Sequence, residues 1–220
     1  KHKYNRRSLA KKSLNKIELQ KQLSVPVDQN IPMIVMISRL VQQKGLDIIL
    51  QSLPSLLTMP VQLVILGTGE PHYEQQLVHW ANRHTERFKV IIGYDESLSH
   101  MIEAASDIYL MPSTFEPCGL NQMYSLRYGT LPIATNVGGL ADTVVNASEE
   151  NIENGTANGF VLTDQTAASL LAAVQHALSL YQEPKTWRQL QTNAMSADFS
   201  WVSSADHYIS LYQQALDERK

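Results

Sequence analysis

Short runs of apolar residues alternate along the chain with longer segments whose apolar positions recur at helical spacing. The runs of four to six residues lie at 33–37, 61–66, 88–92, 107–111, 131–135 and 159–162. Most are apolar throughout, as expected for strands whose two faces are both covered by helices. The pattern therefore predicts six parallel β-strands.

The segments between these runs predict crossover helices at 45–57, 72–86, 97–105, 119–128 and 139–147. Pro71 suits a first helical turn, and Ser97 is the expected N-cap of the helix that follows. Parallel strands need crossovers of this length, because a tight turn cannot connect them. The alternation predicts an α/β fold with a doubly wound, Rossmann-like parallel sheet of about six strands.

After residue 162 the pattern is helical to the end of the chain. Helices are expected over 164–181 and 184–195, and Ser200 is the expected cap of an amphipathic terminal helix. We expect the polar stretch 147–159 to be a loop and the least structured part of the chain. The terminal helix carries apolar residues that we expect to be exposed or packed against a neighbouring copy, namely Trp201, Tyr208, Ile209, Tyr212 and Leu216.

The composition is that of a soluble globular protein. Of the 220 residues 44% are hydrophobic and 18% are charged, and the net charge is −3. No overall basic field favours nucleic acid, and no apolar run has the length of a membrane span or the pattern of a signal peptide. The single cysteine cannot form an internal disulfide, so a cytoplasmic location is expected.

Positive charge is concentrated at the start of the chain, where eight of the 18 Lys and Arg residues fall within the first 21 positions. We expect a solvated helix face there, because Tyr4 is the sole aromatic residue near enough for a nucleic-acid site. Residues 1–24 are interpreted as a basic helical lead-in from a preceding domain, and residues 25–220 as a single domain. The chain begins with Lys rather than Met, which we interpret as a piece of a longer polypeptide.

Chemically useful side chains follow the predicted strands at their carboxyl ends, where open α/β sheets bind ligands. Arg39 and Lys44 follow the first strand, Tyr94 follows the third, and Glu116 and Gly119 follow the fourth. The two cations and the helix start near Gly119 suit a nucleotide diphosphate, because such groups bind phosphate oxygens. Tyr94 offers a face on which a base could stack. Glu116 would repel phosphate, so we expect it to bind hydroxyls or to stabilise developing positive charge.

Each of these residues also has a purely structural explanation. Arg39 and Lys44 could be exposed strand-end charges, and Tyr94 could be a packing residue. Glu116 could cap a helix, and Cys118 is expected to be a small buried hydrophobe. Their convergence on one edge favours the nucleotide site. The sequence has no His and Cys cluster with zinc spacing and no Asp-x-Asp pair, so no metal is expected. A dehydrogenase is disfavoured, because no full dinucleotide fingerprint follows the first strand.

Three stretches of the sequence resemble a known family. They are SRLVQQKGLD, GYDESLSHMIEAASDIYLMPSTFEPCGLNQMYSLRYGTLPIATNVGGLADTV and FSWVSSADHYISLYQQAL. They are similar to the C-terminal domain of bacterial glycogen synthase and plant starch synthase, which are retaining glucosyltransferases of the two-domain GT-B architecture. The resemblance runs from about residue 15 to the end and is densest over 91–145. It implies that 25–220 is a nucleotide-sugar-binding domain.

The resemblance also implies roles for the candidate side chains. Arg39 and Lys44 match the pair that binds the diphosphate of the donor. Glu116 matches the active-site glutamate that contacts the transferred glucose, and Tyr94 matches the residue stacked on adenine. The donor would be ADP-glucose, the acceptor the non-reducing end of an α-1,4-glucan, and the product would keep the anomeric configuration without help from a metal.

A helix tip completes the site that the resemblance implies. The backbone that would hold sugar hydroxyls and the distal phosphate is that of Cys118, Gly119, Leu120 and Asn121. The family usually has Thr in place of Asn121, a change that is harmless if only the backbone is used. Tyr124 stands where many related GT-B transferases have a second Glu, which favours the glycogen and starch synthase branch.

The resemblance covers one domain of a two-domain enzyme, and the motifs of the N-terminal domain do not occur in the sequence. We therefore expect this chain to bind nucleotide weakly and not to transfer glucose by itself. Two alternatives stay open. The chain could belong to another GT-B transferase with a different acceptor, or it could be a non-catalytic nucleotide-binding module.

Overall fold

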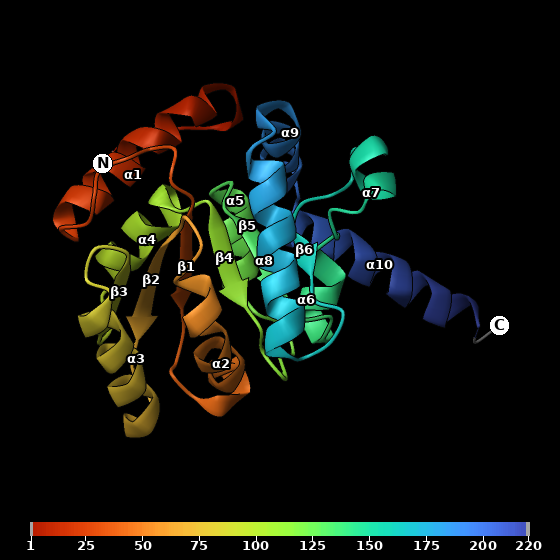
Figure 1. Ribbon diagram of the computed structural model, residues 1–220. Helices are drawn as coiled ribbons and strands as arrows, with labels where there is room; N and C mark the ends of the chain where they lie inside the picture. Colours follow the sequence, from red (N-terminus) through yellow and green to blue (C-terminus); the bar gives the residue numbers. More distant parts are fainter. Residues whose placement is uncertain (1, 219–220) are drawn as a thin grey trace.

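A parallel β-sheet forms the centre of the molecule (Figure 1). The computed structural model describes residues 2–218, with all their side chains except those of residues 206 and 207. In this part of the chain the six strands are ordered β3-β2-β1-β4-β5-β6, and all neighbours are parallel. The strands are β1 (Met33–Ile37), β2 (Gln62–Gly67), β3 (Phe88–Ile92), β4 (Ile108–Met111), β5 (Leu131–Ala134) and β6 (Phe160–Val161). The predicted fold class is confirmed.

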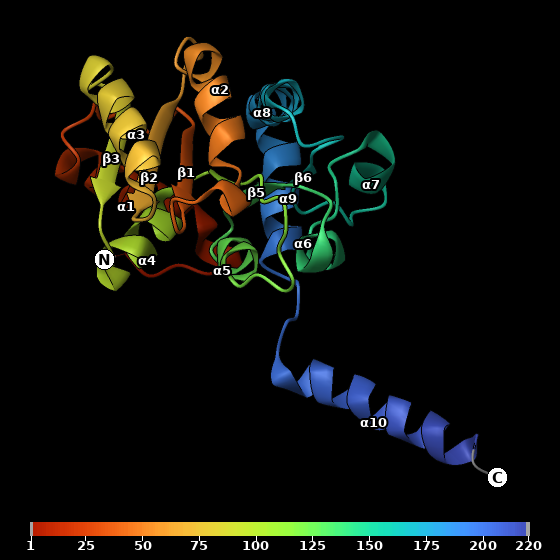
Figure 2. The same cartoon turned by 90° about the horizontal axis from the view of Figure 1, so that it is seen from below.

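Helices cover both faces of the sheet (Figure 2). One layer contains α2 (Leu46–Leu56), α3 (Pro71–Arg83), α8 (Ala167–Tyr181) and α9 (Pro184–Ala194). The other contains α1 (Lys12–Gln22), α4 (Glu96–Ala105), α5 (Asn121–Arg127) and α6 (Gly138–Thr143). In β1, Ile34 and Met36 join the first core while Met33 and Val35 join the second. Because helices shield both faces of the sheet from water, the strands need apolar residues at every position.

The order of the strands creates a crevice at one end of β1. The chain adds β2 and β3 on one side of β1 and then returns to add β4, β5 and β6 on the other side. The connections that follow β1 and β4 therefore lead to helices on opposite faces of the sheet, α2 on one face and α5 on the other. A doubly wound sheet binds its ligands at such a switch point.

Two predicted features of the helix ends are confirmed and one is wrong. Pro71 occupies the first turn of α3, and Ser200 caps α10 (Trp201–Asp217) by accepting a hydrogen bond from the amide of Ser203. Ser97 is not the cap of α4. The cap is Asp95, whose carboxylate accepts a hydrogen bond of 2.9 Å from the amide of Leu98. Asp is at least as good an N-cap as Ser, so the helix begins earlier.

The polar stretch 147–159, predicted to be an irregular loop, contains a short helix. This helix, α7 (Glu149–Glu153), is capped by Ser148, and two glutamates lie in its first turn. Acidic residues at that end interact favourably with the helix dipole, which explains one helical turn in an otherwise polar segment. The loop prediction is wrong over these residues.

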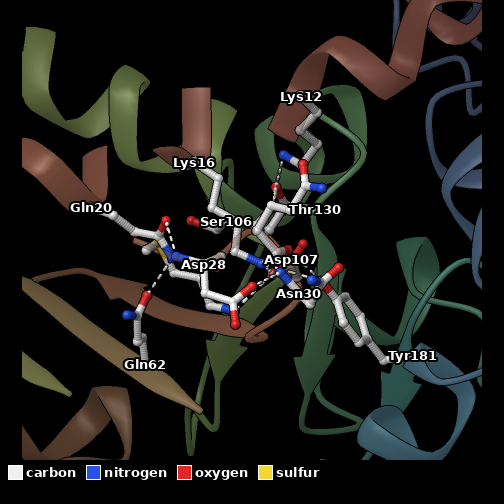
Figure 3. A network of polar contacts seen from close by, with 12 residues as sticks. Lys12, Lys16, Gln20, Asp28, Asn30, Gln62, Ser106, Asp107, Thr130 and Tyr181 are labelled. Carbon is white, nitrogen blue, oxygen red and sulfur yellow. Dashed lines mark hydrogen bonds and ion pairs between the residues drawn. The ribbon is translucent and has the colours of Figure 1, made fainter. Parts of the chain in front are cut away.

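The basic segment at the start of the chain packs against the domain. It forms a 3-10 helix, η1 (Arg6–Lys11), and α1, which lies against α4. Lys12 and Lys16 are buried, so the predicted solvated face is wrong at both positions. Lys16 Nζ lies 2.6 Å from a carboxylate oxygen of Asp107 (Figure 3). Lys12 Nζ donates to Thr130 Oγ1 at 2.7 Å and to the Glu103 carbonyl at 3.0 Å.

Helix α10 extends away from the rest of the molecule (Figure 2). Its apolar residues are exposed, as predicted, and Trp201 has 86% of its surface accessible. The others are Tyr208, Ile209, Tyr212 and Leu216. In the part of the chain that the structure describes, no helix is both long and apolar enough to cross a membrane.

Candidate functional site

Three of the predicted site residues line one cavity at the carboxyl end of the sheet. Arg39 follows β1, Tyr94 follows β3, and Asn121 begins α5, and all three border a cavity of about 410 Å³. Arg39 is exposed, and the Tyr94 ring is 85% exposed. The cavity therefore has a cation and an accessible aromatic face at its rim, which suits a flat base joined to an anion.

Lys44 and Glu116, which do not line this cavity, form an ion pair between the connections that follow β1 and β4. Lys44 ends the short 3-10 helix η2 (Gln42–Lys44), and Glu116 lies in the loop between β4 and α5. The Nζ atom of Lys44 contacts Oε2 of Glu116, and Ser113 Oγ donates to the same oxygen at 3.3 Å. The Lys44 side chain is 18% exposed and that of Glu116 is 10% exposed. The sequence predicted both residues for the site but not their direct contact.

Two glycines let the connections that carry this pair approach each other. A Cβ atom on Gly45 would lie 2.1 Å from the carbonyl oxygen of Pro112. A Cβ atom on Gly138 would lie 2.1 Å from the carbonyl oxygen of Glu116. Both glycines have positive φ, of 76° and 45°. Any side chain at either position would push the loop after β4 away from its neighbours.

The side chain of Asn121 ties α5 to the end of β1. Its Nδ2 donates to the carbonyl oxygen of Ile37 at 2.8 Å and to the hydroxyl of Tyr109 at 2.9 Å. That hydroxyl donates to the Ile37 carbonyl at 2.6 Å, and burial raises the pKa of Tyr109 well above its usual value. Asn121 therefore positions the site through its side chain, a role that sequence analysis left to the backbone.

The segment 118–120 lies before the helix rather than inside it. Helix α5 begins at Asn121 and has seven residues, so the prediction of a helix that starts at 119 is wrong. Cys118 is exposed, which contradicts its predicted burial, and Leu120 is exposed as well. Gly119 has a φ of 73° and turns the chain into α5.

Glu103 is a cavity residue that sequence analysis missed. It belongs to α4, lines the same cavity as Arg39 and Tyr94, and is 4% exposed. Its Oε2 atom is buried and has no hydrogen-bond partner within the described part of the chain. Burial raises the pKa of the Glu103 carboxyl to about 8. A glutamate inside a helical pattern gives no sequence signal that distinguishes it from a surface residue.

Metal-binding side chains do not gather anywhere in residues 2–218. No group of three or more His, Cys, Asp or Glu residues in this range is arranged to hold a metal ion. A second cavity of about 970 Å³, bordered by Tyr4, Arg6, His100 and Arg127, contains none of the predicted site residues.

A family model described as "Glycosyl transferases group 1" matches residues 16–194. The chain is 53% identical over 209 residues to a glycogen synthase of Cellvibrio japonicus, covering 95% of this chain and 43% of that protein. It is 47% identical over 213 residues to glycogen synthase 1 of Methylococcus capsulatus, covering 97% of this chain and 43% of that protein. The chain thus spans less than half the length of these relatives.

Solved structures show the same similarity. The catalytic domain of Arabidopsis thaliana starch synthase IV, bound to ADP and acarbose, superposes with a TM-score of 0.89 at 36% identity. The match covers 99% of this chain and 45% of that one. A sucrose-phosphate synthase of Thermosynechococcus elongatus has a TM-score of 0.65 at 22% identity, over 98% of this chain and 51% of that one, and shares the fold. The predicted resemblance to glycogen and starch synthases is confirmed.

Proposed function

Because the chain belongs to the glycosyl transferases group 1 family, we propose that it forms the donor-binding half of a glycogen synthase. The reaction is transfer of glucose from ADP-glucose to the non-reducing end of an α-1,4-glucan, with retention of the anomeric configuration. One observation supports this proposal more strongly than any other. Arg39 and Tyr94 border one cavity at the carboxyl end of the sheet, and Lys44 and Glu116 form an ion pair between the connections that follow β1 and β4.

The nucleotide occupies the cavity with its base against Tyr94. Stacking on an exposed ring contributes about 1–3 kcal/mol for other base–aromatic pairs. The starch synthase with a TM-score of 0.89 contains ADP, which supports adenine as the base. Arg39 lies on the same cavity and binds the phosphates with its guanidinium group.

Lys44 and Glu116 act where the diphosphate meets the sugar. Lys44 carries one positive charge toward the phosphate while it holds the carboxylate of Glu116. Without that contact, an acid beside a diphosphate would repel the donor. Glu116 is thereby held in a fixed position, where it binds sugar hydroxyls and stabilises positive charge on the ring.

The transfer step breaks the bond between the anomeric carbon and the phosphate oxygen, and ADP leaves with the electron pair. A hydroxyl oxygen of the acceptor's terminal glucose forms the new bond to the anomeric carbon on the face that ADP leaves, and its proton passes to the departing phosphate oxygen. Arg39 and Lys44 stabilise the negative charge that develops on the leaving group, which is electrostatic catalysis by fixed charges. The backbone of Cys118, Gly119 and Leu120, together with the start of α5, borders the distal phosphate and the sugar. These cations fill the role that a divalent metal has in other transferases, so the proposed reaction needs no metal.

The proposed setting is the cytoplasm, with a glucan as the macromolecular partner and with neither nucleic acid nor a membrane involved. The exposed, unpaired Cys118 is typical of a protein kept in a reducing compartment. The net charge of −3 argues against a nucleic-acid partner.

Calorimetric titration tests the nucleotide site directly. We expect ADP and ADP-glucose to bind the chain and UDP to bind more weakly. A chain that binds none of the three, or prefers UDP, would contradict the proposal. A glucose-transfer assay with ADP-glucose and glycogen, on the polypeptide that carries this chain together with the remaining length of its relatives, tests the reaction itself.

A further inference from the structure

One residue that lines the nucleotide cavity has a buried carboxyl oxygen without a partner. The Glu103 side chain projects from α4, one of the helices that border the cavity, and it is 4% exposed. Its Oε2 atom is fully buried and accepts no hydrogen bond from any residue in the range 2–218. Buried polar atoms nearly always have a partner, and one left without a partner costs about 1–3 kcal/mol. An unsatisfied carboxyl in a residue that lines a cavity is a candidate contact for a ligand that enters the cavity.

The cation near Glu103 does not satisfy this oxygen. Lys12 Nζ donates to the backbone carbonyl of Glu103 at 3.0 Å and to Thr130 Oγ1 at 2.7 Å. Glu103 therefore lines the cavity with a carboxyl oxygen that no residue in the range 2–218 satisfies. Burial raises the pKa of the Glu103 carboxyl to about 8, so the group is largely protonated at neutral pH. A protonated carboxyl both accepts and donates a hydrogen bond.

The other acidic residues that line the cavity differ from Glu103. The carboxylate of Asp95 already caps α4 through the amide of Leu98. The side chain of Glu96 is 74% exposed and lies 3.9 Å from His100. Within the described part of the cavity wall, Glu103 is the acid that is both buried and unused.

The position of Glu103 relates it to the nucleoside part of the donor. The proposed function puts the base on Tyr94 and the phosphates on Arg39, and both residues border the cavity that Glu103 also lines. A nucleoside between them offers hydroxyl groups on its ribose and, in adenosine, an exocyclic amino group. We propose that Glu103 binds the nucleoside of the donor by accepting a hydrogen bond from one of these groups. This inference rests on the proposed function.

The test compares ADP with analogues that each lack one donor group. Calorimetry on the protein measures ADP, 2′-deoxy-ADP, 3′-deoxy-ADP and inosine diphosphate, which lacks the amino group. We expect at least one analogue to bind about tenfold more weakly than ADP. Glu103→Met, which removes both oxygens at similar volume, should weaken ADP about tenfold. It should also bring the affinity for that analogue level with the affinity for ADP. The analogue affected identifies the hydroxyl or amino group that Glu103 contacts.

Two controls separate this inference from a general loss of structure. Glu103→Gln keeps one acceptor oxygen and should retain most of the affinity, and Glu86→Gln changes an exposed acid that does not line the cavity and should have no effect. If Glu103→Met does not fold, the affinities of the wild type for the four nucleotides still test the inference. Equal affinities for all four nucleotides would overturn the inference, and so would a folded Glu103→Met with wild-type affinities. Either of these results would leave the proposed function unaffected. Absence of any ADP binding to the wild type would contradict the proposed function as well as this inference.

Discussion

At the scale of single residues, the site depends on a few charges whose partners come from distant parts of the chain. Lys44 and Glu116 are 72 positions apart in the sequence and contact each other between the connections that follow β1 and β4. Both are mostly buried, so removal of one partner leaves the other without compensation. Because Lys44 is proposed to contact the diphosphate and Glu116 the sugar, we expect substitutions at these two positions to affect different steps of the proposed reaction.

Lys44→Ala should weaken the interaction with the donor diphosphate. Loss of one charge-assisted contact costs about 1.5–3 kcal/mol, which corresponds to a fall in kcat/KM of about 10- to 150-fold. Steady-state kinetics with ADP-glucose on the complete polypeptide measures this effect. Lys185→Ala on α9 removes an exposed cation that does not line the cavity and serves as the matched control. Wild-type kinetics for Lys44→Ala would rule out a role for this lysine.

Glu116→Ala should lower kcat more than it weakens ADP binding. The proposed contact of Glu116 is with the sugar, which ADP lacks, while its ion pair with Lys44 is present before the donor binds. Comparison of kcat with the ADP dissociation constant separates the two effects. Full kcat for this variant would show that the carboxylate is not needed for transfer.

The Glu103 carboxyl should make stability depend on pH. Its pKa is raised from 4.5 to about 8 by burial, so between these values the unfolded state loses the proton while the folded state keeps it. The contribution of Glu103 to the free energy of unfolding is therefore present below about pH 4.5. It is lost as pH rises toward 8, by on the order of 1.4 kcal/mol per unit.

Glu103→Gln has no such proton, so chemical denaturation from pH 5 to 8 should show the variant gaining stability relative to the wild type as pH rises. Burial lowers the pKa of Lys12 to about 7, but that lysine is present in both proteins. A constant difference across this range would show that Glu103 is already ionised in the folded state.

At the scale of elements, the sequence predicted strands better than helix ends. The strands were located to within about one residue at most ends, because continuous apolar runs indicate strands that are buried on both faces. The start of a helix depends on which polar side chain forms the N-cap, and Asp95 rather than Ser97 caps α4. Burial of Lys16 could not be predicted, because its partner Asp107 lies 91 positions away.

The close contact between the β1 and β4 connections depends on the glycine at position 45, and Gly155 provides a matched comparison. Gly45 has a φ of 76° and Gly155 a φ of 70°, so alanine is strained at both positions by about 1–2 kcal/mol. A Cβ atom at Gly155 would meet its nearest atom at 3.8 Å, whereas at Gly45 it would lie 2.1 Å from the Pro112 carbonyl oxygen. Gly45→Ala should therefore lose about 1–3 kcal/mol more than Gly155→Ala and also weaken ADP binding. Equal losses in thermal denaturation would show that the contact with Pro112 relaxes freely.

At the scale of the whole molecule, side chains from the segments that follow three strands lie at one edge of the sheet. The sequence predicted this edge because parallel strands end together, and Arg39, Lys44, Tyr94 and Glu116 all follow strand ends. It did not predict Glu103, because a helix residue reaches the cavity only through the way α4 packs on the sheet. Local pattern thus locates a site, while packing decides which buried side chains complete it.

The charge of the assembled site leads to a prediction about metals. In the proposed reaction Arg39 and Lys44 stabilise the negative charge that develops on the leaving ADP, so we expect no separate role for a divalent cation. Glucose transfer by the complete polypeptide should therefore keep its rate when EDTA is added, and added Mg²⁺ should not increase it. The Lys44→Ala variant sharpens the test, because Mg²⁺ could then replace the missing charge and restore part of the rate. Loss of wild-type activity in EDTA, restored by Mg²⁺, would mean that these two cations do not suffice for the leaving group.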